Sequence, residues 1–564
     1  MKKLLALVLC LIMVVSVFAG CGDSGNAFET QGAEETQAAQ ATENTLPEDI
    51  TLTIGLPLNA NVTDYDTNAY TLWLKEKTGY NIVFKKFQTA ENDYKSQIST
   101  MLITGTKMPD ILWNVKLGKS TYEEYGGTYL IDLAPYYNDR EKSATFWERM
   151  SELPEEQQEY VVRQLTSDDG SMWAFPRVEY SLYDTMQYQM YVNQKWLTKL
   201  GLEMPNSPET LYDVLVAFRD RDPNGNGKKD EIPLYGGTGN YADVISWIIN
   251  MFVYCNDARW FNVDENNQLY LPHTTEEYRQ ALIFINKLIK EGLLNSNVFS
   301  AGTKELKNQL NQPAGEVQKV GMFAGHPTIV MSVDNECVYD FEAMPYWGYA
   351  VRADQAFTAA TFITTDCEYP EAAWNLLMVM CSKEGAYRLR YGEKGKDWVD
   401  ADPGTVSFLG QPAELKILNE SVWGNQGNST WGVIQATILT AAENELCQLS
   451  DDMGEWVNRK MKLMADCYYN YVAAEANNPD EKYVMPALAV PDEVSDADYN
   501  ERSNCQKVIN QATSDFCQGT GTYTNPSDPN QWAAYLAELE RQGVNTWTQN
   551  RQLVYELQFP ERVK

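Results

Sequence analysis

Apolar and polar residues near the start of the chain follow two periods, one of two residues and one close to 3.6. Thr51–Leu56 alternates apolar and polar positions, whereas Tyr94–Ile103 carries apolar residues three and four apart. The patterns predict strands over 51–56, 81–87 and 109–114, and helices over 68–77 and 94–103 that stop at Gly79 and Gly105. Strands that alternate with helices in this way are typical of βαβ units, which form a parallel sheet. Ligands of such sheets bind beyond the carboxyl ends of the strands. Trp113 and Asn114 are therefore predicted at a binding edge.

Later segments are more helical. Ser207-Pro208 supplies an N-cap and a first-turn proline, and Thr274–Glu277 reads as a capping box for a helix that Gly292 closes. Further helices are predicted from Tyr369 to Met380 and over 532–540, within a largely helical last ~130 residues.

The N-terminus has the features of an export signal. Met1–Gly20 joins two lysines to an apolar run too short to span a bilayer stably, and it ends in Phe-Ala-Gly before Cys21. This ending resembles a bacterial lipobox, which implies a lipidated Cys21; the alternative is ordinary signal cleavage beside an incidental cysteine. Residues 22–47 are polar and small, and predict a disordered tether.

Composition excludes some functions. The net charge of −33 would repel nucleic acid and anionic membranes, so no nucleic-acid partner is expected. The eight cysteines after Cys21 show no metal-type spacing; Cys505 and Cys517 are the closest pair, and both disulfides and buried thiols remain open. The only histidines, His273 and His326, are interpreted as structural, so neither a histidine-ligated zinc site nor a Ser-His-Asp triad is expected.

The segment Asp222–Glu231, DPNGNGKKDE, concentrates oxygen side chains that suit a hard cation. Asx and glycine residues also favour a simple solvated turn, but five oxygen side chains in ten residues exceed what a turn requires. The twelfth position is Pro233, so the loop departs from a standard EF-hand. The predicted calcium ligands are Asp222, Asn224, Asn226, Lys228, Asp230 and Glu231. Because the loop joins a helix end to the strand Ile232–Tyr235, we expect a structural clip.

The chain resembles the extracellular solute-binding lipoproteins of bacterial ABC importers, in particular the carbohydrate-type members related to oligosaccharide- and alginate-binding proteins. Beyond the lipobox, the matching segments are Lys195–Leu202 with Pro205 and Ser207-Pro208-Glu209, Asp222–Pro233, and Cys367–Ala373 with Tyr391–Trp398. Relatives usually carry Arg shortly before the Trp196-Leu197 pair; Tyr191–Asn193 stands there in this chain, which puts any role of that Arg in doubt.

The resemblance implies an α/β, two-lobed periplasmic-binding-protein-like (type II) fold with an interlobe cleft and a helix-rich C-terminal part. The predicted lobes are 49–178 plus about 350–410, and 179–349 plus about 411–564, with crossings near 176–183 and 347–361.

Sugars are bound by aromatic platforms and converging polar groups. Candidate platforms beside predicted loops or crossings are Trp113, Trp173, Trp247, Trp347, Trp423 and Trp431, with core packing as the alternative for each. Asn114, Arg177, Glu179 and Asn240 are candidates to fix hydroxyls or a uronate.

The resulting prediction is a non-enzymatic, monomeric, lipid-anchored protein on the outer face of a Gram-positive cell membrane. It would bind an oligosaccharide and deliver it to an ABC permease. The alternatives are a surface glycan sensor or adhesin, and a secreted glycan-degrading enzyme with an acid pair.

Overall fold

The computed structural model describes Pro47 and residues 49–182, 186, 188–239, 242–313, 315–332, 336–352, 356–419, 426–432, 437–450, 455–488, 490 and 492–563. The chain divides into two units, Met1–Pro47 and Glu48–Lys564, and the second carries the described fold. The predicted signal, Cys21 and the linker up to residue 46 lie outside the described residues. No helix in the described part is long and apolar enough to cross a membrane.

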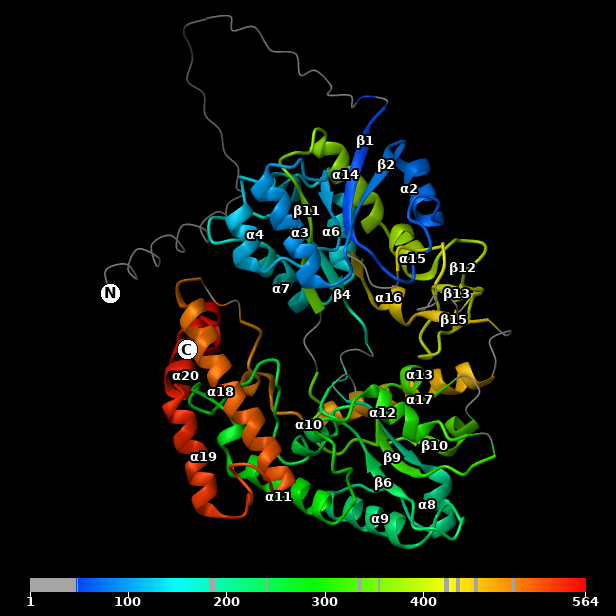
Figure 1. The fold of residues 1–564 in the computed structure, drawn as a ribbon, viewed down its shortest axis with the longest axis vertical. Helices are drawn as coiled ribbons and strands as arrows, with labels where there is room; N and C mark the ends of the chain where they lie inside the picture. Colours follow the sequence, from blue (N-terminus) through cyan, green and yellow to red (C-terminus); the bar gives the residue numbers. More distant parts are fainter. Residues whose placement is uncertain are drawn as a thin grey trace, which may run out of the picture. The chain divides into compact units, whose positions relative to one another are not determined.

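The first sheet has six strands in the order β14-β4-β11-β3-β1-β2 (Figure 1). The strands are β1 (Thr51–Pro57), β2 (Asn81–Phe87), β3 (Ile111–Leu112), β4 (Phe175–Glu179), β11 (Ala356–Ile363) and β14 (Ile438–Leu439). β1 pairs in parallel with β2 and β3, and β14 with β4, whereas β11 is antiparallel to β3 and β4. The predicted parallel sheet is therefore confirmed, and the carboxyl ends of five strands share one edge.

Helices cover this sheet, and local capping sets their ends. They are α2 (Ala69–Thr78), α3 (Glu91–Thr104), α4 (Lys119–Tyr125), α5 (Ala134–Asn138), α6 (Ala144–Ser151), α7 (Glu155–Leu165), α14 (Pro370–Cys381), α15 (Lys383–Tyr391) and α16 (Ala441–Asn444). The Asn68 side chain accepts a hydrogen bond from the N–H of Tyr70 at the start of α2, and Gly79 ends that helix with φ 74°. Such a left-handed conformation favours glycine, as the sequence predicted.

The second sheet has four strands in the order β10-β5-β9-β6. They are β5 (Met190–Asn193), β6 (Ile232–Tyr235), β9 (Val320–Ala324) and β10 (Phe341–Ala343). β5 is antiparallel to β9 and β10, and β6 is parallel to β9, so β6, β9 and β10 end at one edge, where β5 begins. The accompanying helices are α8 (Gln194–Leu200), α9 (Pro208–Asp220), α10 (Val244–Ile249), α12 (Thr303–Leu310), α13 (Pro327–Val330) and α17 (Glu455–Ala474).

A helical group packs beside the second sheet, where α11 and α18 lie side by side (Figure 1). Its helices are α11 (Glu276–Lys290), α18 (Asp492–Gln518), α19 (Pro529–Arg541), α20 (Val544–Gln558) and α21 (Pro560–Val563). Thr275, one residue after the predicted cap, accepts the N–H of Tyr278 at the start of α11. The short strands are β7 (Asn262–Val263), β8 (Leu269–Tyr270), β12 (Trp398–Asp400), β13 (Leu415–Ile417) and β15 (Cys447–Leu449).

The chain passes between the two sheets three times within the second unit. The first two passages, between β4 and β5 and between β10 and β11, overlap the predicted crossings. The third lies between β15 and α17. Residues 411–449 were predicted to belong to the second lobe. In the structure, β14 within this range pairs with β4 of the first sheet.

A buried ion pair fixes this arrangement. Arg149 on α6 lies 2.5 Å from Glu443 on α16, and the two side chains are 1% and 0% exposed. Arg149 also donates to the carbonyl of Ile438, at 3.3 Å. These contacts join residues almost 300 positions apart, so no local pattern in the sequence could predict them.

Seven described cysteines are buried free thiols, among them Cys505 and Cys517. In the structure this pair forms no disulfide, and the buried-thiol alternative holds for these seven described cysteines.

Candidate functional site

The carboxyl edge of the first sheet carries several of the predicted ligand residues. Asn114 follows β3 with φ 54°, and its Oδ1 is buried without a hydrogen-bond partner among the described residues. Arg177 and Glu179, on β4, form an ion pair of 3.0 Å with both side chains largely buried. The edge thus offers an unsatisfied amide oxygen and a guanidinium, two groups that hydrogen-bond sugar hydroxyls.

The carboxyl edge of the second sheet is aromatic. Trp347 and Tyr346 follow β10 and are half-buried, and the indole N–H of Trp347 is buried without a partner among the described residues. Trp247, on α10, is 1% exposed and packs edge-on against Trp347 with a centroid distance of 5.7 Å. The hydroxyls of Tyr346 and Tyr188 share a hydrogen bond of 2.7 Å. Trp347 and Tyr346 are therefore the accessible rings of this group, and Trp247 supports them.

A polar cluster lies where the connecting segments leave the sheets. Arg352 pairs with Glu475, with side chains 35% and 32% exposed. Burial opposes the charge on Arg352, but the Glu475 carboxylate outweighs it and raises the pKa of Arg352 above its ordinary value. Burial raises the pKa of Tyr180, which lies just beyond β4 and close enough to Arg352 and Tyr468 for their charges to act on it. The cluster combines a cation with phenol groups, as a sugar site requires.

Two other predicted tryptophans, Trp113 and Trp431, are packing residues in the structure. Trp113 and Trp431 are 1% and 0% exposed, and their rings meet edge to face at 5.9 Å. Trp431 also donates from Nε1 to the Thr71 hydroxyl at 2.7 Å. Trp173 is half-buried and lies so close to Gly126 that a Cβ there would approach its ring to 2.5 Å. Trp113 and Trp431 therefore have no ring face free for a sugar, whereas Trp173 is packed against Gly126 and stays a candidate.

Asn240 and Trp423 lie outside the described residues, as does Cys21. Sequence reasoning missed Tyr180, Tyr346, Arg352, Tyr468 and Glu475. The tyrosine-rich, weakly charged character of residues 179–190 was one usable signal, since it coincides with the first connecting segment. Arg352 and Glu475 are 123 residues apart, and only the fold brings them together.

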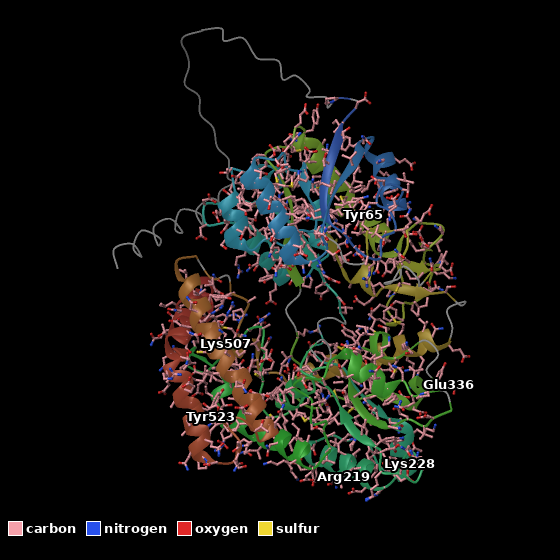
Figure 2. The ribbon with its side chains drawn as sticks, viewed as in Figure 1. Tyr65, Arg219, Lys228, Glu336, Lys507 and Tyr523 are labelled. Carbon is pink, nitrogen blue, oxygen red and sulfur yellow. The ribbon has the colours of Figure 1, made fainter. Side chains whose placement is uncertain are left out.

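The loop Asp222–Glu231 forms a tight turn at the end of α9, and Figure 2 shows Lys228 at the periphery there. Asp222, with φ 46°, accepts backbone N–H groups of Gly225, Asn226 and Gly227 at 2.9–3.1 Å. The side-chain amide of Asn226 donates to Asp230 at 3.0 Å. The loop therefore closes on its own acidic groups.

Glu231 has unmet bonding capacity within this loop. Its Oε1 is buried without a hydrogen-bond partner among the described residues. Burial, together with the neighbouring charges of Asp222 and Asp230, raises the pKa of this carboxyl. As they stand, the carboxyl groups of Asp222, Asp230 and Glu231 lie too far apart to share one divalent cation. The amide of Asn226 would have to turn its oxygen inward, and the carboxylates would have to draw closer together, to complete such a site.

No family model matches the chain. In sequence it is 26% identical to Lipoprotein LipO of Bacillus subtilis over 300 residues, 52% of this chain and 51% of LipO. It is 30% identical to the fructooligosaccharide ABC transporter substrate-binding protein FusA of Streptococcus pneumoniae over 156 residues, 27% of this chain and 29% of FusA. The chain thus spans about half the length of LipO and less of FusA.

Solved structures extend the likeness in fold. A solute-binding protein described as HMO-binding, from Bifidobacterium longum infantis, superposes with TM-score 0.69 at 18% identity, covering 90% of this chain and 99% of that one. The structure of FusA in complex with kestose superposes with TM-score 0.65 at 18% identity, and the match covers 91% of this chain and 100% of FusA. A structure described as an "EF-hand mutant" of FusA superposes with TM-score 0.64 at 17% identity. The alginate-binding protein AlgQ2 "without calcium ion" superposes with TM-score 0.55 at 15% identity.

These comparisons confirm the resemblance seen in the sequence. The chain is similar to extracellular solute-binding lipoproteins of ABC transporters and has their α/β fold.

Proposed function

We propose that the protein is a lipid-anchored extracellular solute-binding protein that captures an oligosaccharide and delivers it to an ABC permease. The observation that carries this proposal is topological. Both sheets present their carboxyl edges to the same connecting segments, and half-buried aromatic and ionic side chains collect there. Ligands of open α/β sheets bind outside the carboxyl ends of the strands.

The ligand residues proposed are those accessible at the two edges. Tyr180, Tyr346 and Trp347 offer ring faces for the apolar side of a sugar, while Arg352 and Asn114 offer polar groups for its hydroxyls. A relative named for fructooligosaccharide transport and a fold neighbour described as HMO-binding support a carbohydrate rather than a peptide. The anchor would be Cys21, by analogy with LipO, a named lipoprotein.

A glycan thermal-shift panel with calorimetry tests this proposal. A bound oligosaccharide present at about 100 times its Kd adds roughly 2.7 kcal/mol to the folded state, which raises Tm by several degrees. We expect fructans, pectic fragments or milk oligosaccharides to do so while peptides do not. A response to peptides alone would overturn the carbohydrate assignment, and release of cleaved sugar would overturn the assignment as a binding protein.

We also propose that Asp222–Glu231 holds a structural calcium ion. The unsatisfied oxygen of Glu231 supports it, as do the charges of Asp222 and Asp230 that act on this carboxyl and fold neighbours described with an EF-hand or by their lack of calcium. The oxygen donors of the loop would hold the ion between the end of α9 and the start of β6. Its contribution would be to stabilise that junction.

A further inference from the structure

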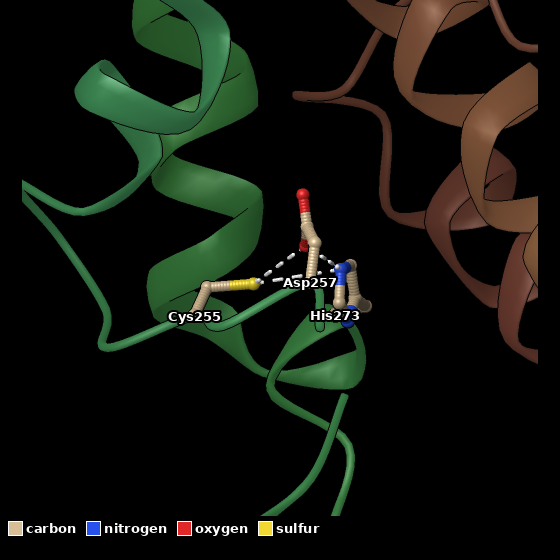
Figure 3. Close-up of side chains that lie close together, drawn as sticks. All are labelled: Cys255, Asp257 and His273. Atoms are coloured by element: carbon tan, nitrogen blue, oxygen red, sulfur yellow. Dashed lines mark hydrogen bonds and ion pairs between the residues drawn. The ribbon is translucent and has the colours of Figure 1, made fainter. Parts of the chain in front are cut away.

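Three side chains outside both proposed sites converge on one point: Cys255, Asp257 and His273 (Figure 3). The Sγ of Cys255 lies 3.4 Å from Nε2 of His273 and 3.7 Å from Oδ1 of Asp257. Nε2 of His273 lies 3.4 Å from the same Oδ1. The three atoms thus form a nearly equilateral triangle.

We propose that Cys255, Asp257 and His273 bind a divalent transition metal of the zinc class, with the fourth position open to water. Zinc binds sulfur at about 2.3 Å and nitrogen or oxygen at about 2.0–2.2 Å. Tetrahedral geometry with those bonds separates the ligand atoms by about 3.3–3.6 Å. The observed triangle has edges of 3.4–3.7 Å, so an ion fits above it without large movement of any side chain.

Hydrogen bonding is the alternative account of the same geometry. The 3.4 Å between Nε2 of His273 and the sulfur is ordinary for a hydrogen bond to sulfur, but the 3.4 Å between Nε2 and the carboxylate oxygen is beyond the usual N–H···O range. Because Nε2 carries at most one proton, hydrogen bonds leave this third edge of the triangle unexplained. A catalytic Cys-His-Asp arrangement is also excluded. In such a triad the carboxylate contacts the other ring nitrogen, whereas here Nδ1 is buried without a partner among the described residues.

The backbone around the cluster is held in place before any ion binds. The Asn250 side chain accepts from the N–H of Cys255 at 2.9 Å and donates to its carbonyl at 3.0 Å. Tyr535 donates to the carbonyl of His273 at 3.2 Å, and Trp260 stacks on its imidazole at 5.0 Å. Metal sites on rigid elements lose little entropy on binding.

Polar groups also lie beside the carboxylate. The Ser246 hydroxyl donates to Asp243 at 2.7 Å and lies 3.4 Å from Oδ2 of Asp257. Because its one proton goes to Asp243, Ser246 is a neighbour of the cluster and does not orient Asp257.

The site is reachable from solvent. Asp257 is 43% exposed, and the cluster lines a hollow of about 570 Å³ whose other wall includes Lys507 and Asn510 of α18. Thiolate, imidazole and carboxylate ligands together favour zinc or its cobalt substitute over calcium. His273 was expected from the sequence to be purely structural, and this inference assigns it a ligand role as well.

The test is cobalt substitution of the reduced, calcium-loaded protein. We expect one Co²⁺ per chain, a thiolate-to-cobalt charge-transfer band and the visible bands of four-coordinate cobalt, all displaced by Zn²⁺. Cys255→Ser should abolish the charge-transfer band, and Asp257→Asn and His273→Gln should each weaken binding at least about tenfold.

Matched controls are Cys517→Ser, a buried thiol elsewhere, and His326→Gln, the other histidine; both should bind like wild type. Asp222→Asn separates this site from the calcium loop and should leave cobalt binding intact. Because Asp257 is partly exposed, Asp257→Asn should fold normally by circular dichroism. Absence of the charge-transfer band in wild type, its persistence in Cys255→Ser, or unchanged affinity in a folded Asp257→Asn would each overturn the proposal.

Discussion

Trp347 meets Trp247 edge to face, with ring centroids 5.7 Å apart and an interplanar angle of 70°. The inner ring is buried and the outer one half-buried, so the pair positions one accessible indole at the carboxyl edge of the second sheet. Aromatic pairs of this geometry stabilise each other by about 0.5–1.5 kcal/mol. A preformed platform of this kind loses little conformational freedom when a ligand stacks on it.

Replacing Trp347 with Ala should weaken oligosaccharide binding by at least about tenfold, or about 1.4 kcal/mol, because a central aromatic contact is lost. Calorimetry would measure the loss. The matched control is Trp147→Ala, which removes a half-buried tryptophan on α6 and should leave affinity unchanged. Equal affinity in Trp347→Ala and wild type would remove this residue from the site.

Removing calcium with a chelator should lower Tm while leaving sugar affinity nearly intact. The reason is that the loop lies between the end of α9 and the start of β6, away from the proposed ligand edges. Asp222→Asn should have a low Tm that the chelator no longer changes. Asp264→Asn alters a comparable turn, in which Asp264 accepts N–H groups of Asn266 and Gln268, and should keep chelator sensitivity. A large loss of affinity in a folded, calcium-free protein would place the loop in the binding site.

Arg149→Met should destabilise the protein by about 3–5 kcal/mol, because it leaves the Glu443 carboxylate buried without its partner. The double variant Arg149→Met/Glu443→Leu should recover most of that loss. Denaturant unfolding of both variants measures the difference. Lys462→Met removes one half of an exposed pair with Asp466 and should change stability by less than about 1 kcal/mol. If Arg149→Met lost as little stability as Lys462→Met, the Arg149–Glu443 pair would not be what holds β14 in the first sheet.

Stability should depend on Glu414 at neutral pH but not in acid. Burial works against ionisation of this carboxyl, yet hydrogen bonds from Lys383 and Tyr387 prevail and lower its pKa below the ordinary 4.5. A carboxyl whose pKa is lower in the folded than in the unfolded protein stabilises the fold fully at pH above the unfolded-state pKa. That stabilisation is lost as the pH falls through the folded-state pKa. Wild type should therefore exceed Glu414→Gln in urea midpoint at pH 7, and the gap should close below about pH 4. A gap that widens in acid would reverse the assigned direction.

The sequence by itself determined the local elements and the class of protein. The predicted end of α2 at Gly79 and the start of α9 at Ser207 match the structure, because caps and periodicity depend on neighbours within a few residues. The alternation of strands with helices from β1 to β3 likewise predicted the parallel sheet. Segment order and the Asp222–Pro233 loop were enough for the family resemblance.

The tertiary structure decided which side chains are accessible and which meet. In the sequence, Trp113, Trp431 and Trp347 all stand beside predicted loops or crossings. Trp113 and Trp431 are nevertheless buried, because burial depends on which distant segments pack over a ring. The place of β14 in the first sheet depends on Arg149 meeting Glu443, and the proposed metal site depends on Cys255 meeting His273. Contacts between residues far apart in sequence leave no periodic trace in it, so these features required the fold.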